Sequence, residues 1–181
     1  MRGQKVSLYP LRFEDKEVLF RWINERELVH FNAPYKPVSE LEHDEWFKRI
    51  TQREDVFFFV IKENEKDIPI GSCQLHNVHR VHRSAELQTR IGDRRYQNKG
   101  YGTEAIELLL KFGFEDLNLH RIYLHVLKDN ERARKVYRNT GFTVEGELCE
   151  AAFINGRYLD VQLMSILRDA YKKRTSKVEK R

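Results

Sequence analysis

The order of strand-like and helical segments limits what this chain can fold into. Three segments of strand-type sequence, residues 56–62, 68–75 and 85–91, lie close together in the first half. A strand–helix–strand–helix section follows. Near the end, Asn155-Gly156 lies between two alternating segments, which predicts a β-hairpin. The pattern needs the whole chain, so we predict an α/β (α+β) domain with a mixed sheet flanked by helices.

Apolar periodicity and turn residues place the other elements. The helices that we expect are residues 14–23, 39–50, 101–114 and 131–139. Ser39 followed by Glu42 is a capping box, and Gly141 ends the last of these helices. Further strands are expected at residues 6–11 and 121–127.

The net charge of +5 comes from one end of the chain. Residues 168–181 hold seven basic and two acidic side chains, so basic and acidic side chains are equal in number in the rest of the 181 residues. We predict one domain over residues 1–168 and a basic, flexible tail over residues 169–181. A solvated terminus is the favoured interpretation, and salt-dependent RNA binding by the tail is the alternative. We expect no nucleic-acid partner.

The apolar content argues against a membrane protein. The longest uninterrupted apolar run, residues 56–61, has six residues, whereas a membrane-spanning helix needs about 20. The N-terminus shows no apolar stretch of the kind found in secretory signals. We therefore expect a cytoplasmic location and no membrane partner.

The cysteines and histidines do not predict a metal site. Cys73 and Cys149 are too few for a disulfide framework, and we expect both to be buried small side chains. His76, His79 and His82 fall in one connection between strands. Zinc needs fixed geometry and usually a fourth ligand, so we predict no metal.

Residues 91–103 join a strand to the helix that begins at residue 101. Gly100 and Gly102 let the backbone come close to a bulky anion, and free amides of the first helical turn can hold phosphate oxygens. Positive charge beside them comes from Arg94, Arg95 and Lys99. The segment is neither a P-loop nor a dinucleotide fingerprint. Taken alone, it leaves open a phosphate site or a glycine-rich start of a helix.

A second group of residues follows about one strand later in the chain. Asn130 and Tyr137 are seven apart, so they lie near one face of a helix. A tyrosine hydroxyl could protonate a thiol leaving group, and an asparagine amide could hold a ligand carbonyl. The alternatives are a helix N-cap for Asn130 and a core aromatic for Tyr137.

Together, the two groups resemble the GNAT acetyltransferase superfamily. The shared pattern is Gln97-x-x-Gly100-x-Gly102, a strand, and then Asn130-x-x-Ala133-x-x-x-Tyr137-x-x-x-Gly141-Phe142. Within the superfamily, the chain is most similar to the branch that holds the spermidine/spermine and ribosomal-protein N-terminal acetyltransferases, and residues 82–88, 118–126 and 153–160 are especially similar to the polyamine enzymes. The resemblance implies a mostly antiparallel sheet, splayed between two central parallel strands, residues 85–91 and 121–127.

The resemblance also implies acetyl-CoA as co-substrate and assigns residues to it. The implied cofactor-binding residues are Arg90, Ile91 and Gly92 beside the pantetheine arm, the amides of Gln97, Asn98, Lys99, Gly100, Tyr101, Gly102 and Thr103 at the pyrophosphate, and Asn130 with Ala133 at the pantetheine end. Tyr137 would be the general acid. A phenol pKa near 10 suits a thiolate of pKa near 8.5.

The acceptor amine must lose a proton, and Glu86 is our candidate base, with a cross-strand ion pair as its alternative role. Polyamine enzymes have acidic residues in the loop that corresponds to residues 32–37 of this chain, where this chain has Lys36.

We predict an N-acetyltransferase that moves the acetyl group directly to a primary amine, which is a polyamine-like molecule, an amino sugar or a protein N-terminus. A non-catalytic acyl-CoA-binding module is the alternative. The sequence leaves open whether the chain forms a homo-oligomer.

Overall fold

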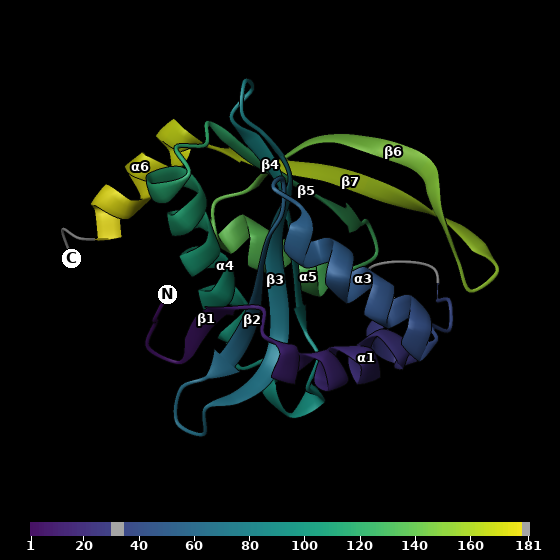
Figure 1. Cartoon of the computed structure of the whole chain (residues 1–181). Coiled ribbons are helices and arrows are strands. Elements are labelled where there is room, and N and C mark those ends of the chain that lie inside the picture. Colours follow the sequence, from purple (N-terminus) through teal and green to yellow (C-terminus); the bar gives the residue numbers. More distant parts are fainter. Residues whose placement is uncertain (30–34, 179–181) are drawn as a thin grey trace.

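One mixed sheet organises the computed structural model of the chain, which describes residues 1–29 and 35–178 (Figure 1). The strands are β1 (Val6–Pro10), β2 (Phe57–Glu63), β3 (Ile68–His79), β4 (Ser84–Ile91), β5 (Arg121–Leu127), β6 (Thr143–Ile154) and β7 (Arg157–Leu167). The α-helices are α1 (Lys16–Asn24), α2 (Arg26–Val29), α3 (Glu40–Gln52), α4 (Tyr101–Lys111), α5 (Glu131–Asn139) and α6 (Arg168–Val178). Short helical turns are η1 (Phe13–Asp15), η2 (Arg94–Tyr96) and the π-turn η3 (Phe112–Asp116).

The strand order is β1-β2-β3-β4-β5-β7-β6, and its central pair is parallel. Strands β4 and β5 pair over only three positions, from Ser84–Arg121 to Glu86–Tyr123, and then separate. Beyond that point β4 stays paired to β3, and β5 stays paired to β7 along its whole length. The predicted mixed, mostly antiparallel sheet with splayed parallel strands is confirmed.

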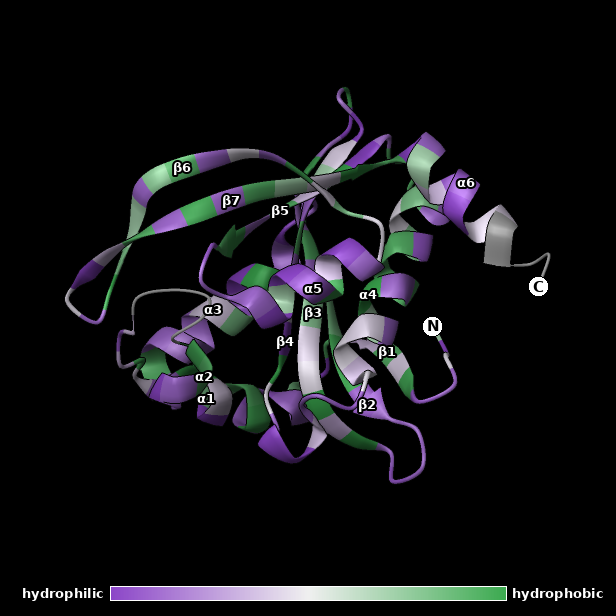
Figure 2. Cartoon of the chain, turned by 180° about the vertical axis from the view of Figure 1, so that it is seen from behind, coloured by the Kyte–Doolittle hydropathy of each residue, from purple (hydrophilic) through white to green (hydrophobic). Residues whose placement is uncertain are grey.

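Helices cover both faces of the sheet. Helices α1 and α3 lie over the face toward the viewer in Figure 1, and α4 and α5 lie over the opposite face in Figure 2. The apolar side of α4 is fully buried through Ala105, Ile106, Leu109 and Leu110, and each large side chain there contributes about 1.5–3 kcal/mol. A second cluster joins α1 to the other face through Trp22, packed with Trp46 and Phe58. Both packings fix β3 and β4 in place.

Local sequence signals explain where several elements begin and end. The Ser39 side chain accepts a hydrogen bond from the Glu42 amide, so the predicted capping box is present. Gly141 has φ of 99° just after α5, and Asn155 and Gly156 have φ of 51° and 77° in the turn between β6 and β7. These left-handed positions favour Asn and Gly. The predicted helix end and closing hairpin are confirmed.

Strands β6 and β7 extend beyond the rest of the sheet as an arm (Figure 1). Most side chains of β6 are exposed, including Cys149, so the prediction of a buried Cys149 is wrong; Cys73 is buried. The base of the arm is held by Glu145, which accepts hydrogen bonds from Arg121 and from Ser165. These partners lower the pKa of Glu145 to about 2, with Arg121 as the larger cause.

The chain does not become a solvated tail at residue 169. Residues 168–178 form α6, in which Tyr171 is buried and stacks on Phe114 with ring centroids 4.8 Å apart. The Tyr171 hydroxyl donates to Glu115 at 2.7 Å. The predicted flexible tail is therefore wrong as far as α6 extends, because one aromatic side chain anchors a basic segment. Residues 179–181 lie outside the described part.

Two further findings concern membrane and metal. No helix in residues 1–29 or 35–178 is long and apolar enough to cross a membrane.

Strand β3 runs to His79, so His76 and His79 belong to a strand rather than to the predicted connection, and the His79 ring stacks on His82. The part of the chain that the structure describes contains no group of three His, Cys, Asp or Glu side chains that could hold a metal ion.

Close packing of β3 on β4 predicts the effect of one methyl group. A Cβ atom at Gly71 would lie 2.2 Å from the Arg90 carbonyl oxygen, whereas one at Gly146 would have no atom within 4 Å. We expect Gly71→Ala to lower the free energy of unfolding by about 1–3 kcal/mol. Gly146→Ala should stay within about 0.5 kcal/mol of wild type. Urea denaturation of both variants measures this; equal stabilities would contradict the packing.

Candidate functional site

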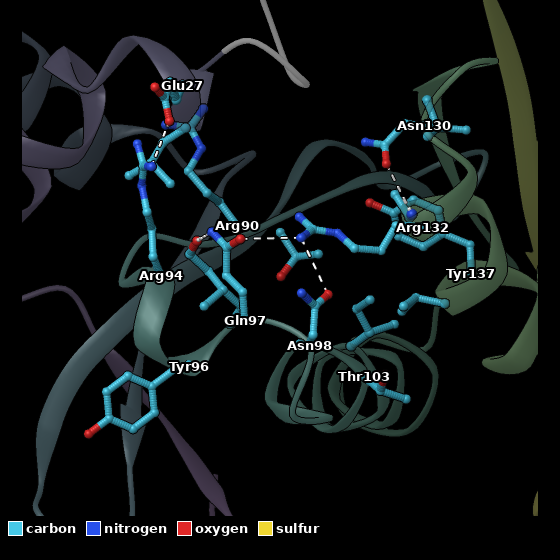
Figure 3. Close-up of a pocket in the computed structure, with 18 of the residues that line it drawn as sticks. Glu27, Arg90, Arg94, Tyr96, Gln97, Asn98, Thr103, Asn130, Arg132 and Tyr137 are labelled. Carbon is cyan, nitrogen blue, oxygen red and sulfur yellow. Dashed lines mark hydrogen bonds and ion pairs between the residues drawn. The ribbon is translucent and has the colours of Figure 1, made fainter.

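A cleft of about 600 Å³ opens where β4 and β5 part, and we call it the main cleft. Its walls come from the ends of β4 and β5, the start of α4, and α5 (Figure 3). The predicted site residues that line it are Arg90, Ile91, Gln97, Asn98, Gly100, Gly102, Thr103, Asn130, Ala133 and Tyr137. The structure therefore brings most of the predicted cofactor residues together with the predicted general acid.

The start of α4 has the features of an anion site. Gly100 is its N-cap with φ of 87°, and no side chain caps the helix. The first helical hydrogen bond runs from the Glu104 amide to the Gly100 carbonyl, so the preceding amides have no partner within the helix. A Cβ atom at Gly102 would meet only Ile91, at 3.5 Å. The backbone here is open to a phosphate, and the helix dipole favours one.

Cations and amides complete this end of the main cleft. The Arg132 guanidinium donates to Gln97 Oε1 at 3.2 Å and to Asn98 Oδ1 at 3.4 Å (Figure 3). Gln97 in turn donates to the Ile91 carbonyl at 3.0 Å. The sequence reasoning did not single out Arg132, which links α5 to the loop before α4. The contact adds positive charge beside the open amides.

Three predicted cofactor residues, Gly92, Lys99 and Tyr101, are not in the described lining of the main cleft. The Gly92 amide donates to the Ile70 carbonyl at 2.9 Å, and a Cβ atom at Gly92 would lie 2.2 Å from the Trp22 ring. The carbonyl of Lys99 accepts from the Lys5 side chain, and the Tyr101 ring packs on Tyr96. Gly92 thus permits close packing of α1.

Tyr137 lies at the other end of the main cleft, on α5. Its side chain is buried, and its ring packs edge-on against Phe142. Burial raises the pKa of Tyr137 to about 12, so the predicted value near 10 is wrong and the phenol keeps its proton. Its hydroxyl has no hydrogen-bond partner within the described residues. The group is a free proton donor facing the cleft.

Asn130 has the capping role that the sequence left open. Its side-chain oxygen accepts from the Ala133 amide at 3.1 Å, which starts α5. Its side-chain N–H₂ group donates no hydrogen bond to a described residue, so both N–H donors are available to a ligand. Capping and ligand contact are therefore compatible at this position.

Glu86 is not in the described lining of the main cleft, but it contacts a residue that is. His125 Nδ1 lies 2.8 Å from Glu86 Oε1, and Asn77 donates to Glu86 Oε2 at 3.2 Å. His125 lines the cleft. A carboxylate can only accept, so the neutral imidazole carries its proton on Nδ1 and has a basic Nε2. Sequence reasoning missed His125 because the parallel register that pairs Glu86 with Tyr123 was unknown.

A second cavity of about 420 Å³, which we call the side pocket, lies between helices α1 and α3 and the sheet. Thr89 and Arg90 line both cavities, so β4 forms a shared wall. The Thr89 hydroxyl oxygen is buried and has no hydrogen-bond partner within the described residues. Trp22 and Trp46 pack in the cluster between α1, α3 and the sheet and also line the side pocket. The sequence did not predict this pocket.

Comparison with known proteins identifies the family and the fold. Residues 5–143 match the acetyltransferase (GNAT) domain family. The chain belongs to the GNAT acetyltransferase family. The resemblance drawn from the two sequence motifs is thereby confirmed, and so is the prediction of an N-acetyltransferase that uses acetyl-CoA as co-substrate.

Several relatives of this GNAT chain are spermidine acetyltransferases. It is 38% identical over 171 residues to the spermidine N(1)-acetyltransferase of Escherichia coli K12, covering 93% of this chain and 89% of that protein. The Vibrio cholerae spermidine N(1)-acetyltransferase is 36% identical over 175 residues, covering 96% and 99%. A crystal structure of the spermidine N-acetyltransferase from Vibrio cholerae, in complex with CoA and spermine, superposes with a TM-score of 0.88 at 33% identity, covering 94% and 99%.

The open backbone at Gly102 gives a prediction for this GNAT cleft. Gly102→Glu should weaken acetyl-CoA binding by about 100-fold or more, because the new carboxylate repels phosphate and fills the space at the helix start. Calorimetry measures the affinity. Gly102→Ala is the matched control: it introduces no charge and should lower affinity far less. Unchanged affinity in Gly102→Glu would remove the start of α4 from the cofactor site.

Proposed function

We propose that this acetyltransferase moves the acetyl group from acetyl-CoA to a primary amine directly, while both substrates are bound. One observation carries the proposal: Thr89 and Arg90 on β4 line both the main cleft and the side pocket. The phosphate-binding end and Tyr137 lie in the main cleft, which leaves the side pocket for the acceptor. Two substrates can therefore approach the same point from different sides, as direct transfer needs.

The edges of the splayed strands would hold the pantetheine arm. Beyond Glu86, the side of β4 that faces β5 has no strand partner within the described residues. Backbone groups there are strong donors and acceptors that need partners. Amide groups of a pantetheine chain are chemically suited to them. The start of α4 would hold the pyrophosphate, and the Asn130 amide group would contact the pantetheine end.

Tyr137 would act on the departing sulfur. Its pKa of about 12 makes complete proton transfer to a free thiolate of pKa about 8.5 uphill. The hydroxyl therefore first donates a hydrogen bond to the negative charge that develops on sulfur as the C–S bond breaks. Protonation then completes as the thiolate loses its contact with water, which raises the pKa of the thiol.

His125, oriented by Glu86, would accept the proton of the amine. Nε2 of His125 takes this proton, the amine nitrogen bonds to the acetyl carbon, and the electron pair of the C–S bond leaves with sulfur. Glu86 contacts His125 on the other ring nitrogen, 2.8 Å away, so its negative charge stabilises the imidazolium that forms. Glu86 is thus a positioning residue in this proposal, rather than the base itself.

The two proton-transfer roles predict different pH behaviour. Tyr137→Phe should lower kcat by about 10²–10⁴ at every pH, with acetyl-CoA affinity unchanged, because one hydroxyl is lost. His125→Gln should lower kcat strongly near neutral pH and recover at alkaline pH, where the amine loses its proton without help. Steady-state kinetics across pH measures both.

The matched control for the tyrosine is Tyr171→Phe, which removes a buried hydroxyl of α6 away from the main cleft. This control should keep wild-type kcat. A near-normal rate in Tyr137→Phe, with chemistry rate-limiting, would make Tyr137 a packing residue. A His125→Gln profile parallel to wild type at all pH values would remove His125 as the base.

The acceptor is tested with a panel of amines. Polyamines are the first class, because the similar proteins are named for spermidine and one binds spermine in its crystal structure. Amino sugars and N-terminal peptides are the other classes. We expect thiol release with at least one class. If acetyl-CoA binds tightly and every amine fails, the chain is an acyl-CoA-binding module; the unpartnered Tyr137 hydroxyl argues against that outcome.

Two properties of the whole protein complete the proposal. A homo-oligomer is expected, because a structure of the Vibrio cholerae relative is dodecameric, with a TM-score of 0.83, and the arm exposes Leu148, Phe153 and Tyr158. Light scattering after gel filtration tests this. We also propose a cytoplasmic location, which cell fractionation tests.

A further inference from the structure

Arg90 is a partly buried cation that has no partner of opposite charge among the described residues. It lines both the main cleft and the side pocket and is partly buried. None of its five N–H donors bonds to a described residue. Burial lowers the pKa of Arg90 below its ordinary value, yet a guanidinium stays charged in proteins. Removing a charge even partly from water without compensation is costly, so a guanidinium between two cavities that bonds to no described residue favours an anionic ligand.

The acids near the two cavities are already paired. Among the described lining residues, the acids are Glu27 in the main cleft and Glu42 in the side pocket. Glu27 forms an ion pair with Arg94 at 2.6 Å, and Glu42 forms one with Lys36 at 2.7 Å. The Lys36 and Ser39 contacts lower the pKa of Glu42 to about 2, so it stays ionised and paired.

The cations of the side pocket are not paired. Arg49 on α3 lines the side pocket together with Arg90, and its side chain has no partner within the described residues. His43, also in the lining, is neutral near pH 7, because burial lowers its pKa. The side pocket therefore presents the partly buried Arg90 and the exposed Arg49, neither paired with a described residue, and one neutralised carboxylate. Charge complementarity disfavours a ligand with several positive charges there.

The rest of the side pocket is apolar. Trp22, Trp46 and Phe58 form one wall, with the Trp46 and Phe58 rings edge to face at 5.6 Å. Its volume of about 420 Å³ is within the usual range for small-molecule sites, about 300–1,000 Å³. An amide pair, Gln74 to Gln88 at 2.6 Å, lies beside the apolar wall. The pocket thus fits a small amphipathic molecule.

We propose that the side pocket binds the non-reacting part of an acceptor amine that carries an anionic group and an apolar segment, with Arg90 pairing the negative charge. The inference rests on the proposed function and narrows its substrate class. A carboxylate or a phosphate would match the planar donors of Arg90 equally well. Spermidine and spermine, which carry several positive charges and no negative one, would be poorer acceptors.

The test compares amines that differ only in the anionic group. Omega-amino acids of increasing length are each matched to the alkylamine of the same length. Apolar α-amino acids are matched to their amides, and aminoalkyl phosphates to the amino alcohols. We expect the anionic member to have a kcat/KM about 10- to 100-fold higher in at least one series, the range of a charge-assisted hydrogen bond. It should also exceed spermidine.

Variants assign the preference to Arg90. Arg90→Gln should abolish the anionic preference and change the KM for acetyl-CoA by about twofold or less. Arg90→Lys, which keeps the charge but loses the planar fork, should keep part of the preference. Arg49→Gln, at an exposed position on α3, should reduce the preference if Arg90→Gln does not fold. Arg80→Gln, an exposed turn residue paired with Glu54, is the matched control and should behave as wild type.

Three results would overturn the inference. The first is equal or better turnover of the neutral member in every series. The second is a preference that Arg90→Gln leaves intact. The third is efficient turnover of spermidine with none of the anionic amines, which would refute this inference but support the proposed function. An intact preference together with a large rise in the KM for acetyl-CoA in Arg90→Gln would assign Arg90 to the cofactor. Failure of every amine would refute the proposed function itself.

Discussion

The separation of β4 from β5 after Glu86 and Tyr123 is the constraint on which the site depends. Each strand keeps its outer neighbour, so the sheet behaves as two halves joined at three residue pairs. The gap exposes backbone groups of β4 to the main cleft and lets α5 place Tyr137 at its far end. A sheet with continuous central pairing would have no room for a pantetheine chain between its strands, and the start of α4 would face solvent.

Charge divides this opening into two environments. The glycines at the start of α4, with Arg132 nearby, favour the phosphates of the cofactor. On the other side of β4, the side pocket combines an apolar wall with Arg90 and Arg49. The relatives that share the fold are named for spermidine, whereas the charges of the side pocket favour an acceptor with an anionic group. Fold alone does not fix the acceptor.

Local signals made much of this structure predictable from sequence. The Ser39–Glu42 capping box, the Asn155-Gly156 turn and the spacing from Asn130 to Tyr137 each involve residues close in the chain. The contacts that sequence could not predict join distant residues. Glu86 meets His125 only because β4 and β5 pair in one parallel register, and Tyr171 is buried only because Phe114 lies 57 positions earlier. The lack of a partner at Arg90 depends on every surrounding element, so no local pattern reveals it.

Hydrogen exchange of the backbone amides tests most directly whether the gap between β4 and β5 receives the cofactor. Exchange is measured by mass spectrometry, with and without acetyl-CoA, for peptides that cover residues 84–91, residues 97–103 and α6. The account predicts that acetyl-CoA slows exchange in the first two segments and leaves α6 unchanged. Protection at the start of α4 with none along residues 84–91 would contradict it, because the splayed strand would then hold no part of the cofactor.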